Sequence, residues 1–350
     1  MSAVSAAPAS QIIKALIFRV SAALILIGIV YWLLINLMKS PTQFFQASVI
    51  GISNGVLYAL IALGYTLVYG IIELINFAHG DVLMIGAMVA LSAIRLLSVL
   101  WPDWPLLVLI SSLLIAMVAC ATLSYAIEKV AYRPLRNAPR LAPLITAIGI
   151  SILLQTIAMM IWSRNPMTFP QLLPSSPMDI LGTGATITVK EIVIIAASVV
   201  VMVGLLILVD KTRLGRAMRA IAENRQVASL MGVDADKVIS LTFVLGGTLA
   251  ALAGVMVATN YGNVHFYMGF TPGLKAFTAA VLGGIGNLPG AMLGGLILGL
   301  IESLGAGYVG DLTGGVFGSN YQDVFAFAVL ILVLIFRPSG LLGERVADRA

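Results

Sequence analysis

A serine, a histidine and an aspartate stand in an order that could support nucleophilic catalysis. Ser53 lies in the run Gly51-Ile-Ser-Asn-Gly55, which matches the nucleophile elbow G-x-S-x-G, and His79 and Asp81 follow downstream. The elbow requires a sharp turn from a strand into a helix, whereas this run lies inside a continuous apolar segment. Its two glycines also form G-x-x-x-G, which lets membrane helices approach closely. Helix packing is the favoured interpretation, and an intramembrane serine protease is the weaker alternative.

Other catalytic chemistries lack their residues in this sequence. The phosphate-binding loop G-x-x-x-x-G-K-[ST] is missing, because no Gly-Lys dipeptide occurs, so we do not expect the chain to bind ATP in that way. His79 and His265 are the two histidines and Cys120 is the single cysteine. This leaves no H-E-x-x-H motif, no thiol cluster and no intrachain disulfide. The sequence therefore predicts no catalytic residue, no metal site and no cofactor held by this chain.

Polar and ionisable side chains within apolar segments are the candidates for a transport function. Such groups are costly in a membrane and usually mark a pathway or a gate, although some of them cap helices. The residues that we assign to this role are Asn54, Glu73, Asn76, His79, Asp81, Gln155 and Glu302. An ion-coupled secondary transporter is an alternative, in which Glu73, Asp81 or Glu302 would serve as a proton site.

A basic loop over residues 213–237 carries an amphipathic helical pattern. Small and apolar residues recur there at spacings of three and four, as in a short helix with one apolar face. Gly232 suits the C-terminal cap of this helix, and Asp234 can cap the membrane helix that follows. The pattern suggests docking on a cytoplasmic partner, and a helix lying on the membrane surface is the alternative. The residues assigned to this loop are Arg219, Ala222, Glu223, Asn224, Ala228, Gly232 and Asp234.

The elements that must hold these residues are membrane helices. Hydrophobic residues make up 60% of the 350 and charged residues 10%, far below the charged fraction of an ordinary soluble domain. Apolar runs long enough to cross a hydrocarbon core of about 30 Å recur along the whole chain. They predict an all-α polytopic membrane protein with about eight crossings, over residues 16–38, 45–70, 82–100, 105–127, 142–162, 191–209, 238–259 and 319–336.

Basic residues in the connecting loops predict the orientation. The net charge of +5 arises largely in these loops, so it indicates membrane topology and not nucleic-acid binding. Basic residues crowd the connections 129–140 and 211–237, which places both in the cytoplasm. The connection 163–189 has Arg164 as its one basic residue and is rich in proline, as expected outside the membrane. Both termini are then cytoplasmic, and residues 344–350 form a cytoplasmic tail.

A glycine-rich break interrupts the apolar region before the last crossing. The orientation requires an even number of crossings between residues 260 and 318, and the break separates an apolar half of about 13 residues from one of about 18. We predict a broken or re-entrant helix pair, because irregular backbone at membrane depth is tolerated where protein or a water-filled cavity surrounds it. A tight turn at the membrane surface is the alternative. The glycines assigned to the break are Gly283, Gly284, Gly286 and Gly290.

Five separated motifs occur in one order along the chain. They are Asn54-Gly-Val-Leu-Tyr-Ala-Leu-Ile-Ala-Leu-Gly64, Asn76-Phe-Ala-His-Gly-Asp81, the loop from Ala220 to Asp234, the run from Gly283 to Gly290, and Phe336-Arg-Pro-Ser-Gly-Leu-Leu-Gly343. In this order they resemble the LivH-type branched-chain amino acid permeases of bacterial ABC importers. The resemblance covers residues 42–343, and residues 1–41 are an N-terminal extension with an extra membrane helix.

The resemblance implies a transport subunit rather than an enzyme. Its implied partners are a LivM-like permease subunit, two cytoplasmic ATPase subunits that hydrolyse ATP, and an external solute-binding protein. The implied substrates are leucine, isoleucine and valine or related small polar solutes, carried across the bacterial cytoplasmic (inner) membrane. The resemblance also implies that the 213–237 loop sits on an ATPase subunit, although the spacing from Glu223 to Gly232 departs from the shorter E-A-A-x-x-x-G pattern of other importers.

Overall fold

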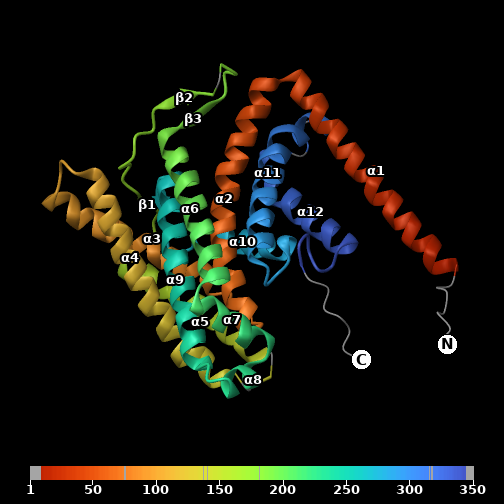
Figure 1. Ribbon diagram of the computed structural model, residues 1–350. Coiled ribbons are helices and arrows are strands. Elements are labelled where there is room, and N and C mark those ends of the chain that lie inside the picture. Colours follow the sequence, from red (N-terminus) through yellow and green to blue (C-terminus); the bar gives the residue numbers. More distant parts are fainter. Residues whose placement is uncertain are drawn as a thin grey trace, which may run out of the picture.

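The computed structural model describes residues 9–343 apart from positions 75, 137, 140, 181, 315 and 317 (Figure 1). Its α-helices are α1 (Ala9–Lys39), α2 (Pro41–Ile72), α3 (His79–Leu100), α4 (Pro105–Ile127), α5 (Leu141–Ile161), α6 (Val189–Lys211), α7 (Arg213–Glu223), α8 (Arg225–Leu230), α9 (Ala235–Tyr261), α10 (Phe270–Gly283), α11 (Leu288–Leu312) and α12 (Gln322–Phe336). Its short π and 3-10 segments are η1 (Glu128–Tyr132), η2 (Arg133–Leu135) and η3 (Ser319–Tyr321).

Strands play a minor part in the structure. They are β1 (Met167–Thr168), β2 (Pro177–Asp179), β3 (Thr186–Thr188) and β4 (Asn263–Val264). β1 pairs with β4 and β2 pairs with β3, each antiparallel, with Met167 opposite Val264 and Pro177 opposite Thr188. The predicted all-α class is confirmed, because every strand is only two or three residues long.

Eight helices in the described part of the chain are long and apolar enough to cross a membrane, which confirms the polytopic prediction. Seven of them coincide with predicted crossings: α2, α3, α4, α5, α6, α9 and the stretch η3–α12. The other is α11, whose stretch 288–310 has the length of a full crossing. The first predicted crossing, 16–38, lies within α1, a helix of 31 residues.

Local sequence signals explain where the long helices begin and end. α2 starts with Pro41 in its first turn, where the missing N–H is not needed. α6 starts with a capping box, in which the Thr188 hydroxyl accepts from the Glu191 N–H and the Glu191 carboxylate accepts from the Thr188 N–H. α9 ends at Gly262, whose φ of 71° lies in the left-handed region that favours glycine.

α2 and α9 occupy the centre of the bundle. In the most apolar 18-residue stretch of each helix, 78% of the residues of α2 and 72% of those of α9 are buried, compared with 17% of those of α5. α4, α5 and α6 instead expose large apolar side chains such as Ile110, Ile152 and Val200. Exposed aliphatic side chains on long apolar helices are what contact with lipid requires. The bundle thus has a packed centre and an exposed apolar periphery.

Glycines allow α2 and α11 to cross in close contact. A Cβ atom on Gly55 would lie 2.9 Å from the Leu296 Cα, and one on Gly299 would lie 2.4 Å from the Gly51 carbonyl oxygen. Backbone atoms of the two helices therefore approach where no side chain fits. The predicted packing role of Gly51 and Gly55 is confirmed, and Ser53 lies between them in a continuous helix and not at a strand-to-helix turn.

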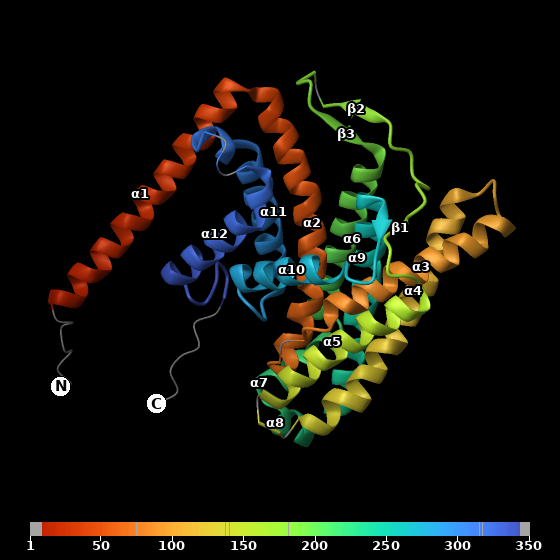
Figure 2. The ribbon, with the colours of Figure 1, turned by 180° about the vertical axis from the view of Figure 1, so that it is seen from behind.

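The glycine-rich break separates α10 from α11. α10 has 14 residues, a length of about 21 Å that is too short to cross about 30 Å of hydrocarbon. It runs across the bundle near mid-height, and α11 then turns back beside α2 (Figure 2). Asn287 begins α11 by accepting a hydrogen bond from the Gly290 N–H at 2.8 Å. The predicted broken pair is therefore present, with its break at 284–287.

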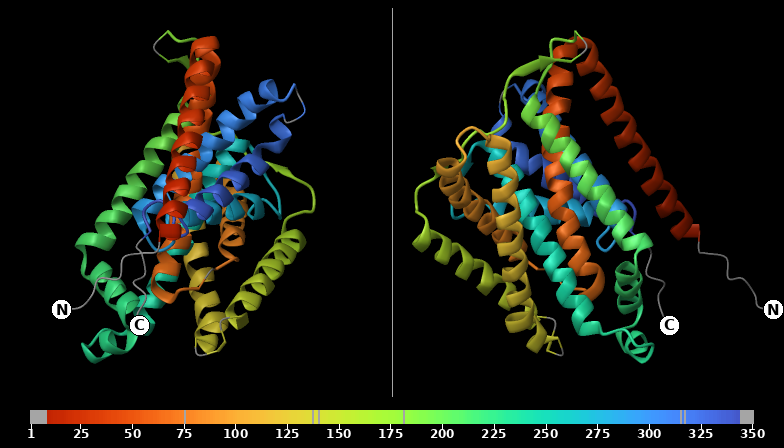
Figure 3. Two further views of the ribbon diagram at one scale, coloured as in Figure 1. Left: turned by 90° about the vertical axis from the view of Figure 1, so that its right-hand side faces the viewer. Right: turned by 60° about the vertical axis from the view of Figure 1, so that its left-hand side comes forward.

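The bundle has two distinct ends. α7 and α8 lie at one end, below α6 and α9, and the β2–β3 hairpin lies at the other (Figures 1 and 3). α1 joins α2 at the β2–β3 end and leans away from the other helices. It touches the bundle through Trp32, whose ring packs edge-on to that of Tyr308 at 6.2 Å. We call the two ends the α7–α8 end and the hairpin end.

Candidate functional site

The loop between α6 and α9 folds into two short helices and not into the single helix expected from its sequence. Asn224 is the reason for the break. It ends α7 in an extended conformation, and its side chain then caps α8 by accepting from the backbone N–H groups of Gln226 and Val227, each at 3.0 Å. Asparagine is a strong N-cap residue, so capping of α8 by the Asn224 side chain is favoured over continuation of α7 through this position.

The caps predicted at the end of this loop are present. Gly232 has φ of 85°, and its N–H bonds to the Ser229 carbonyl while the Val233 N–H bonds to the Ala228 carbonyl, each at 3.1 Å. This is a Schellman motif. Asp234 caps α9 by accepting from the Lys237 N–H at 3.1 Å. That backbone bond and the Lys237 ammonium lower the pKa of the exposed Asp234 carboxyl.

The two faces of α8 differ from those expected. Ala228 is 3% exposed and packs into the protein, so it does not lie on the outer face where the helical spacing placed it. The outer face carries Val227, Leu230 and Met231, with the last two 87% and 81% exposed. We call these three residues the α8 tip. Arg219, Ala222 and Glu223 on α7 are exposed as well, and the Arg219 guanidinium donates to the Val209 carbonyl.

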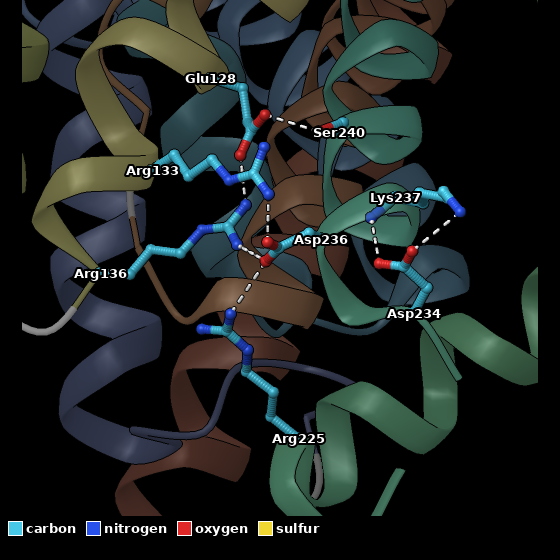
Figure 4. A network of polar contacts seen from close by, with 8 residues as sticks. All are labelled: Glu128, Arg133, Arg136, Arg225, Asp234, Asp236, Lys237 and Ser240. Carbon is cyan, nitrogen blue, oxygen red and sulfur yellow. Dashed lines mark hydrogen bonds and ion pairs between the residues drawn. The ribbon is translucent and has the colours of Figure 1, made fainter. Parts of the chain in front are cut away.

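A network of charged side chains ties α8 to the ends of α4 and α9 (Figure 4). Asp236, in the first turn of α9, accepts from three arginines: Arg133 and Arg136 in the α4–α5 connection, and Arg225 on α8. Arg136 also donates to Glu128, whose side chain is fully buried and accepts from the Ser240 hydroxyl at 2.6 Å. Charge-assisted bonds of this kind fix geometry more firmly than neutral ones.

An open groove of about 690 Å³ lies beside this network. It is lined by side chains of α8, of the α4–α5 connection and of the first turn of α9, namely Arg133, Arg136, Arg225, Gln226, Ser229, Leu230 and Asp236. Arg133 and Arg225 are about half exposed. The α7–α8 end therefore presents the exposed apolar α8 tip next to a groove with exposed guanidinium groups.

Four of the predicted pathway residues gather around the start of α3. The Gln155 amide on α5 donates to the Asp81 carboxylate at 2.9 Å. The Tyr132 hydroxyl donates to the Asn76 side chain at 2.9 Å. His79 is buried, with its ring 4.8 Å from that of Tyr65. Glu73, by contrast, is exposed at the end of α2, with φ of 51°.

The protease alternative fails on geometry. A Cβ atom on Gly64 would lie 2.3 Å from His79 Nε2, so this ring packs against α2 at Gly64. Ser53 lies on the same helix 11 residues earlier, which corresponds to about 16 Å along the axis. A general base must lie within hydrogen-bond reach of its nucleophile. His79 therefore cannot activate Ser53 in this fold.

Of the other two predicted pathway residues, Asn54 is only partly buried, whereas Glu302 belongs to a second buried cluster that contains residues the sequence interpretation missed. Lys275 on α10 pairs with Glu302 at 2.6 Å and with Asp323 on α12 at 2.7 Å. Tyr261 donates to the Asn54 side chain at 3.4 Å. The signal that would have revealed Lys275 is its position as the one charged residue of the apolar segment 270–283.

The four glycines of the break are placed differently. A Cβ atom on Gly283 would lie 1.9 Å from the Gly290 carbonyl oxygen, and one on Gly290 would lie 2.5 Å from the Gly283 carbonyl oxygen. Gly284 has φ of 111° and lies against Gly343. Gly286 has φ of 91° but nothing within 4 Å of a Cβ, so its backbone conformation, and not crowding, requires glycine.

Among the described residues, no group of three or more His, Cys, Asp or Glu side chains is arranged to hold a metal ion. Some buried side-chain atoms, among them His79 Nε2 and Glu302 Oε2, have no hydrogen-bond partner among the described residues.

Comparison with known proteins identifies the family. The family model described as branched-chain amino acid transport system / permease component matches residues 48–334. The high-affinity branched-chain amino acid transport system permease protein BraD of Pseudomonas aeruginosa is 46% identical over 314 residues, covering 89% of this chain and 100% of that protein. The corresponding LivH of Escherichia coli K12 is 44% identical over 310 residues, covering 87% and 97%.

A more distant relative has a similar description. The probable branched-chain amino acid transport permease protein LivH of Methanocaldococcus jannaschii is 27% identical over 294 residues, covering 82% of this chain and 89% of that protein. The family model covers α2 through most of α12, so it includes the central helices, the α7–α8 loop and the broken pair. The chain therefore belongs to the family of branched-chain amino acid transport system permease components.

Proposed function

We propose that this chain is one membrane-spanning subunit of an ATP-driven importer for branched-chain amino acids or related small polar solutes. The observation that carries the proposal is the family match over residues 48–334, together with near-complete coverage of BraD and LivH. The sequence contains no G-x-x-x-x-G-K-[ST] phosphate-binding loop, so ATP hydrolysis is assigned to partner subunits. It works in a bacterial inner membrane with both termini in the cytoplasm.

The partners follow from this role. A second, LivM-like permease completes the pathway, two cytoplasmic ATPase subunits supply the energy, and an external binding protein delivers the solute. The α7–α8 end is the cytoplasmic end in this arrangement, because the basic connections 129–140 and 211–237 lie there. The hairpin end faces the binding protein.

We assign docking on an ATPase subunit to the α8 tip and the adjoining groove. Large apolar side chains that are more than four-fifths exposed, such as Leu230 and Met231, need a partner surface in the assembled protein. The caps at Asn224 and Gly232 hold α8 in one orientation. Through Arg225 and Asp236, displacement of α8 would reach α4 and α9 as a rigid-body movement.

The docking assignment predicts a specific loss of coupling. Leu230→Asp combined with Met231→Asp should reduce both co-purification of the ATPase subunits and leucine uptake about tenfold or more, the usual effect of removing a buried interface anchor. Met178→Asp, on an exposed apolar residue of β2 at the hairpin end, serves as the matched control and should leave the ATPases bound. Full association and uptake in the Leu230/Met231 variant would contradict the assignment.

ATP dependence distinguishes this function from ion-coupled transport. The assembled complex in proteoliposomes, with its binding protein present, should take up leucine only when ATP is available to the ATPase side. A protonophore should leave uptake unchanged. Uptake without ATP that is driven by an imposed proton gradient would overturn the proposal and favour a secondary transporter.

A further inference from the structure

The arginine network at the α7–α8 end carries more positive than negative charge. In the described part of the chain, its ion pairs join three guanidinium groups to two carboxylates, a net charge of +1. Arg136 and Glu128 pair inside the protein, where their side chains are 9% and 0% exposed. Arg133 and Arg225 are 42% and 46% exposed and share the other carboxylate, that of Asp236. The uncompensated charge therefore lies at the exposed end of the network.

Asp236 holds the two exposed guanidinium groups in place (Figure 4). Arg133 donates to its Oδ2 atom, and Arg225 donates to its Oδ1 atom at 3.1 Å. Each of these bonds uses one of the five N–H donors of a guanidinium group. Other donors on both groups can therefore bond to a second anion. The entropy of ordering these two long side chains is lost before that anion binds, which favours its binding.

The groove of about 690 Å³ places these donors beside the α8 tip. Six of its seven lining residues are polar or charged, and the seventh is Leu230. Leu230 also belongs to the α8 tip, where it is 87% exposed. The groove and the tip thus form one continuous surface. A partner that buries the tip must also place its own groups over Arg133 and Arg225.

The position of this surface favours a protein partner over a lipid headgroup. α4, η1 and η2 form one stretch of 31 residues, roughly 46 Å long if fully α-helical, whereas the hydrocarbon core is about 30 Å thick. Arg133 lies near the end of this stretch, and α8 lies at the same end of the bundle, below α6 and α9 (Figures 1 and 3). In the proposed orientation this end faces the cytoplasm, where the ATPase subunits bind.

We propose that the groove receives an acidic side chain of the ATPase subunit, whose carboxylate bonds to Arg133 and Arg225 while the α8 tip is buried against the same subunit. The inference rests on the proposed function and adds to it the chemistry of the ATPase surface at the docking site. A carboxylate brings the charge of the network to zero, and arginine pairs with carboxylates in a geometry that fixes orientation. A basic group at this position would be repelled.

Salt-dependent binding tests this proposal. The purified permease pair is placed in lipid nanodiscs, and labelled ATPase subunits are titrated at low and at high salt. Arg225→Gln should weaken ATPase binding about tenfold at low salt, the effect of losing one charge-assisted hydrogen bond. High salt should reduce the difference from wild type, because mobile ions screen exposed charges. Arg133→Gln should behave alike, and it leaves the sequence of α8 unaltered.

Lys129→Gln is the matched control. It removes the same charge from the same connection as Arg133, and its exposed side chain does not line the groove. This variant should bind the ATPase subunits as tightly as wild type. An equal loss of binding in Lys129→Gln would show that net charge alone matters, and the groove would lose its assigned role.

A charge swap tests for the acidic side chain itself. Arg225→Glu should bind the ATPase subunits more weakly than Arg225→Gln, because two carboxylates would then face each other. Each Asp and Glu of the ATPase subunit is changed in turn to Arg, and at least one of these changes should restore binding to Arg225→Glu. A purely structural arginine would not be rescued in this way, because its bond to Asp236 stays lost. Failure of every change to restore binding would overturn the proposal.

Lipid composition tests the alternative ligand. The Arg225→Gln titration is repeated in nanodiscs of phosphatidylcholine alone and of phosphatidylcholine with phosphatidylglycerol. The loss of ATPase binding should be equal in both. A loss that occurs only with the anionic lipid would assign the groove to a lipid headgroup and refute the proposed ATPase contact.

The remaining outcomes separate this inference from the proposed function. If Arg133→Gln and Arg225→Gln bind the ATPase subunits as wild type does, while the Leu230/Met231 variant loses them, the groove contact is refuted and docking at the α8 tip stands. If all three variants bind normally, the docking assignment itself fails. ATP-driven leucine uptake by the complete complex decides separately whether the chain belongs to an importer.

Discussion

At the scale of single residues, glycine determines how closely α11 approaches its neighbours. Gly295 and Gly299 meet α2, while Gly290 and Gly294 meet α10. In lipid, helices gain little from the hydrophobic effect, so close van der Waals packing between small residues carries much of their association. Glycine in a helix costs about 1 kcal/mol relative to alanine. Its repeated use here indicates that close approach outweighs this cost.

Gly295→Ala should therefore destabilise the protein, although alanine is the better helix former. A Cβ atom at 295 would lie 2.4 Å from the Ala59 backbone nitrogen, whereas one at Gly204 would have nothing within 4 Å. Overpacking typically costs about 1–3 kcal/mol. Thermal unfolding in detergent, followed with a thiol-reactive dye on the buried Cys120, should show a lower transition temperature for Gly295→Ala. Gly204→Ala should unfold at the same temperature as wild type or higher, because alanine favours the helix and meets no clash there. The opposite ranking of the two variants would contradict the α2–α11 packing.

The pathway residues show what single positions in a sequence can and cannot reveal. Burial of Asn76, His79, Asp81 and Glu302 follows the general rule that polar groups in apolar segments face the protein interior. Their partners did not follow from the sequence. Lys275 is 27 positions before Glu302 and 48 before Asp323, and only the fold of α10, α11 and α12 brings the three together.

At the scale of elements, the link between α8 and the membrane helices depends on one carboxylate. Asp236 accepts from arginines on α8, on η2 and just after η2, so it connects the loop that we assign to ATPase docking with both α4 and α9. Arg136 has only 9% of its side chain exposed and continues the link to the buried Glu128. Loosening this link should impair transmission of movement before it impairs folding.

Asp236→Asn should lower the amount of leucine imported per ATP hydrolysed. The neutral amide removes the charge shared by three guanidinium groups, and each charge-assisted bond contributes roughly 1.5–3 kcal/mol when buried and less where exposed. Lys237→Gln is the control, because the Lys237 side chain is 86% exposed and its pair with Asp234 should contribute only about 0–1 kcal/mol. Both rates are measured on the complex in proteoliposomes. An unchanged ratio in Asp236→Asn would show that the network is not part of coupling.

Long elements were more predictable than short ones for a physical reason. A membrane crossing needs about 20 apolar residues in a row, and this signal is strong enough to place α2 to α6, α9, α12 and the break before α11. The short loop 213–232 has no such constraint. Its spacing fits one helix, but the side-chain cap at Asn224 splits it and turns Ala228 inward. The exposed apolar side chains at the end of α8 are therefore Leu230 and Met231, and not Ala228.

At the scale of the whole molecule, the arrangement of the two ends constrains how the chain sits in the membrane. The α7–α8 end collects the arginine network and the basic connections, and the hairpin end carries the proline-rich connection 163–189. Positive charge is enriched on the cytoplasmic side of membrane proteins. α1 runs from the hairpin end toward the α7–α8 end, so a cytoplasmic N-terminus requires this helix to cross the membrane as well.

Cysteine labelling in intact cells should reveal this orientation directly. The native Cys120 is fully buried and should give little background with an impermeant maleimide. Ser175→Cys, near β2, and Met38→Cys, at the α1–α2 junction, are exposed positions at the hairpin end and should label from outside. Gln226→Cys, exposed on α8, should label only after the membrane is permeabilised. Each variant must retain uptake, which ensures that the labelled protein is correctly inserted.

Labelling of Gln226→Cys in intact cells would reverse the orientation and remove the α8 tip from any cytoplasmic ATPase. Protection of Met38→Cys alone would contradict the placement of the α1–α2 junction at the same exposed end as the hairpin.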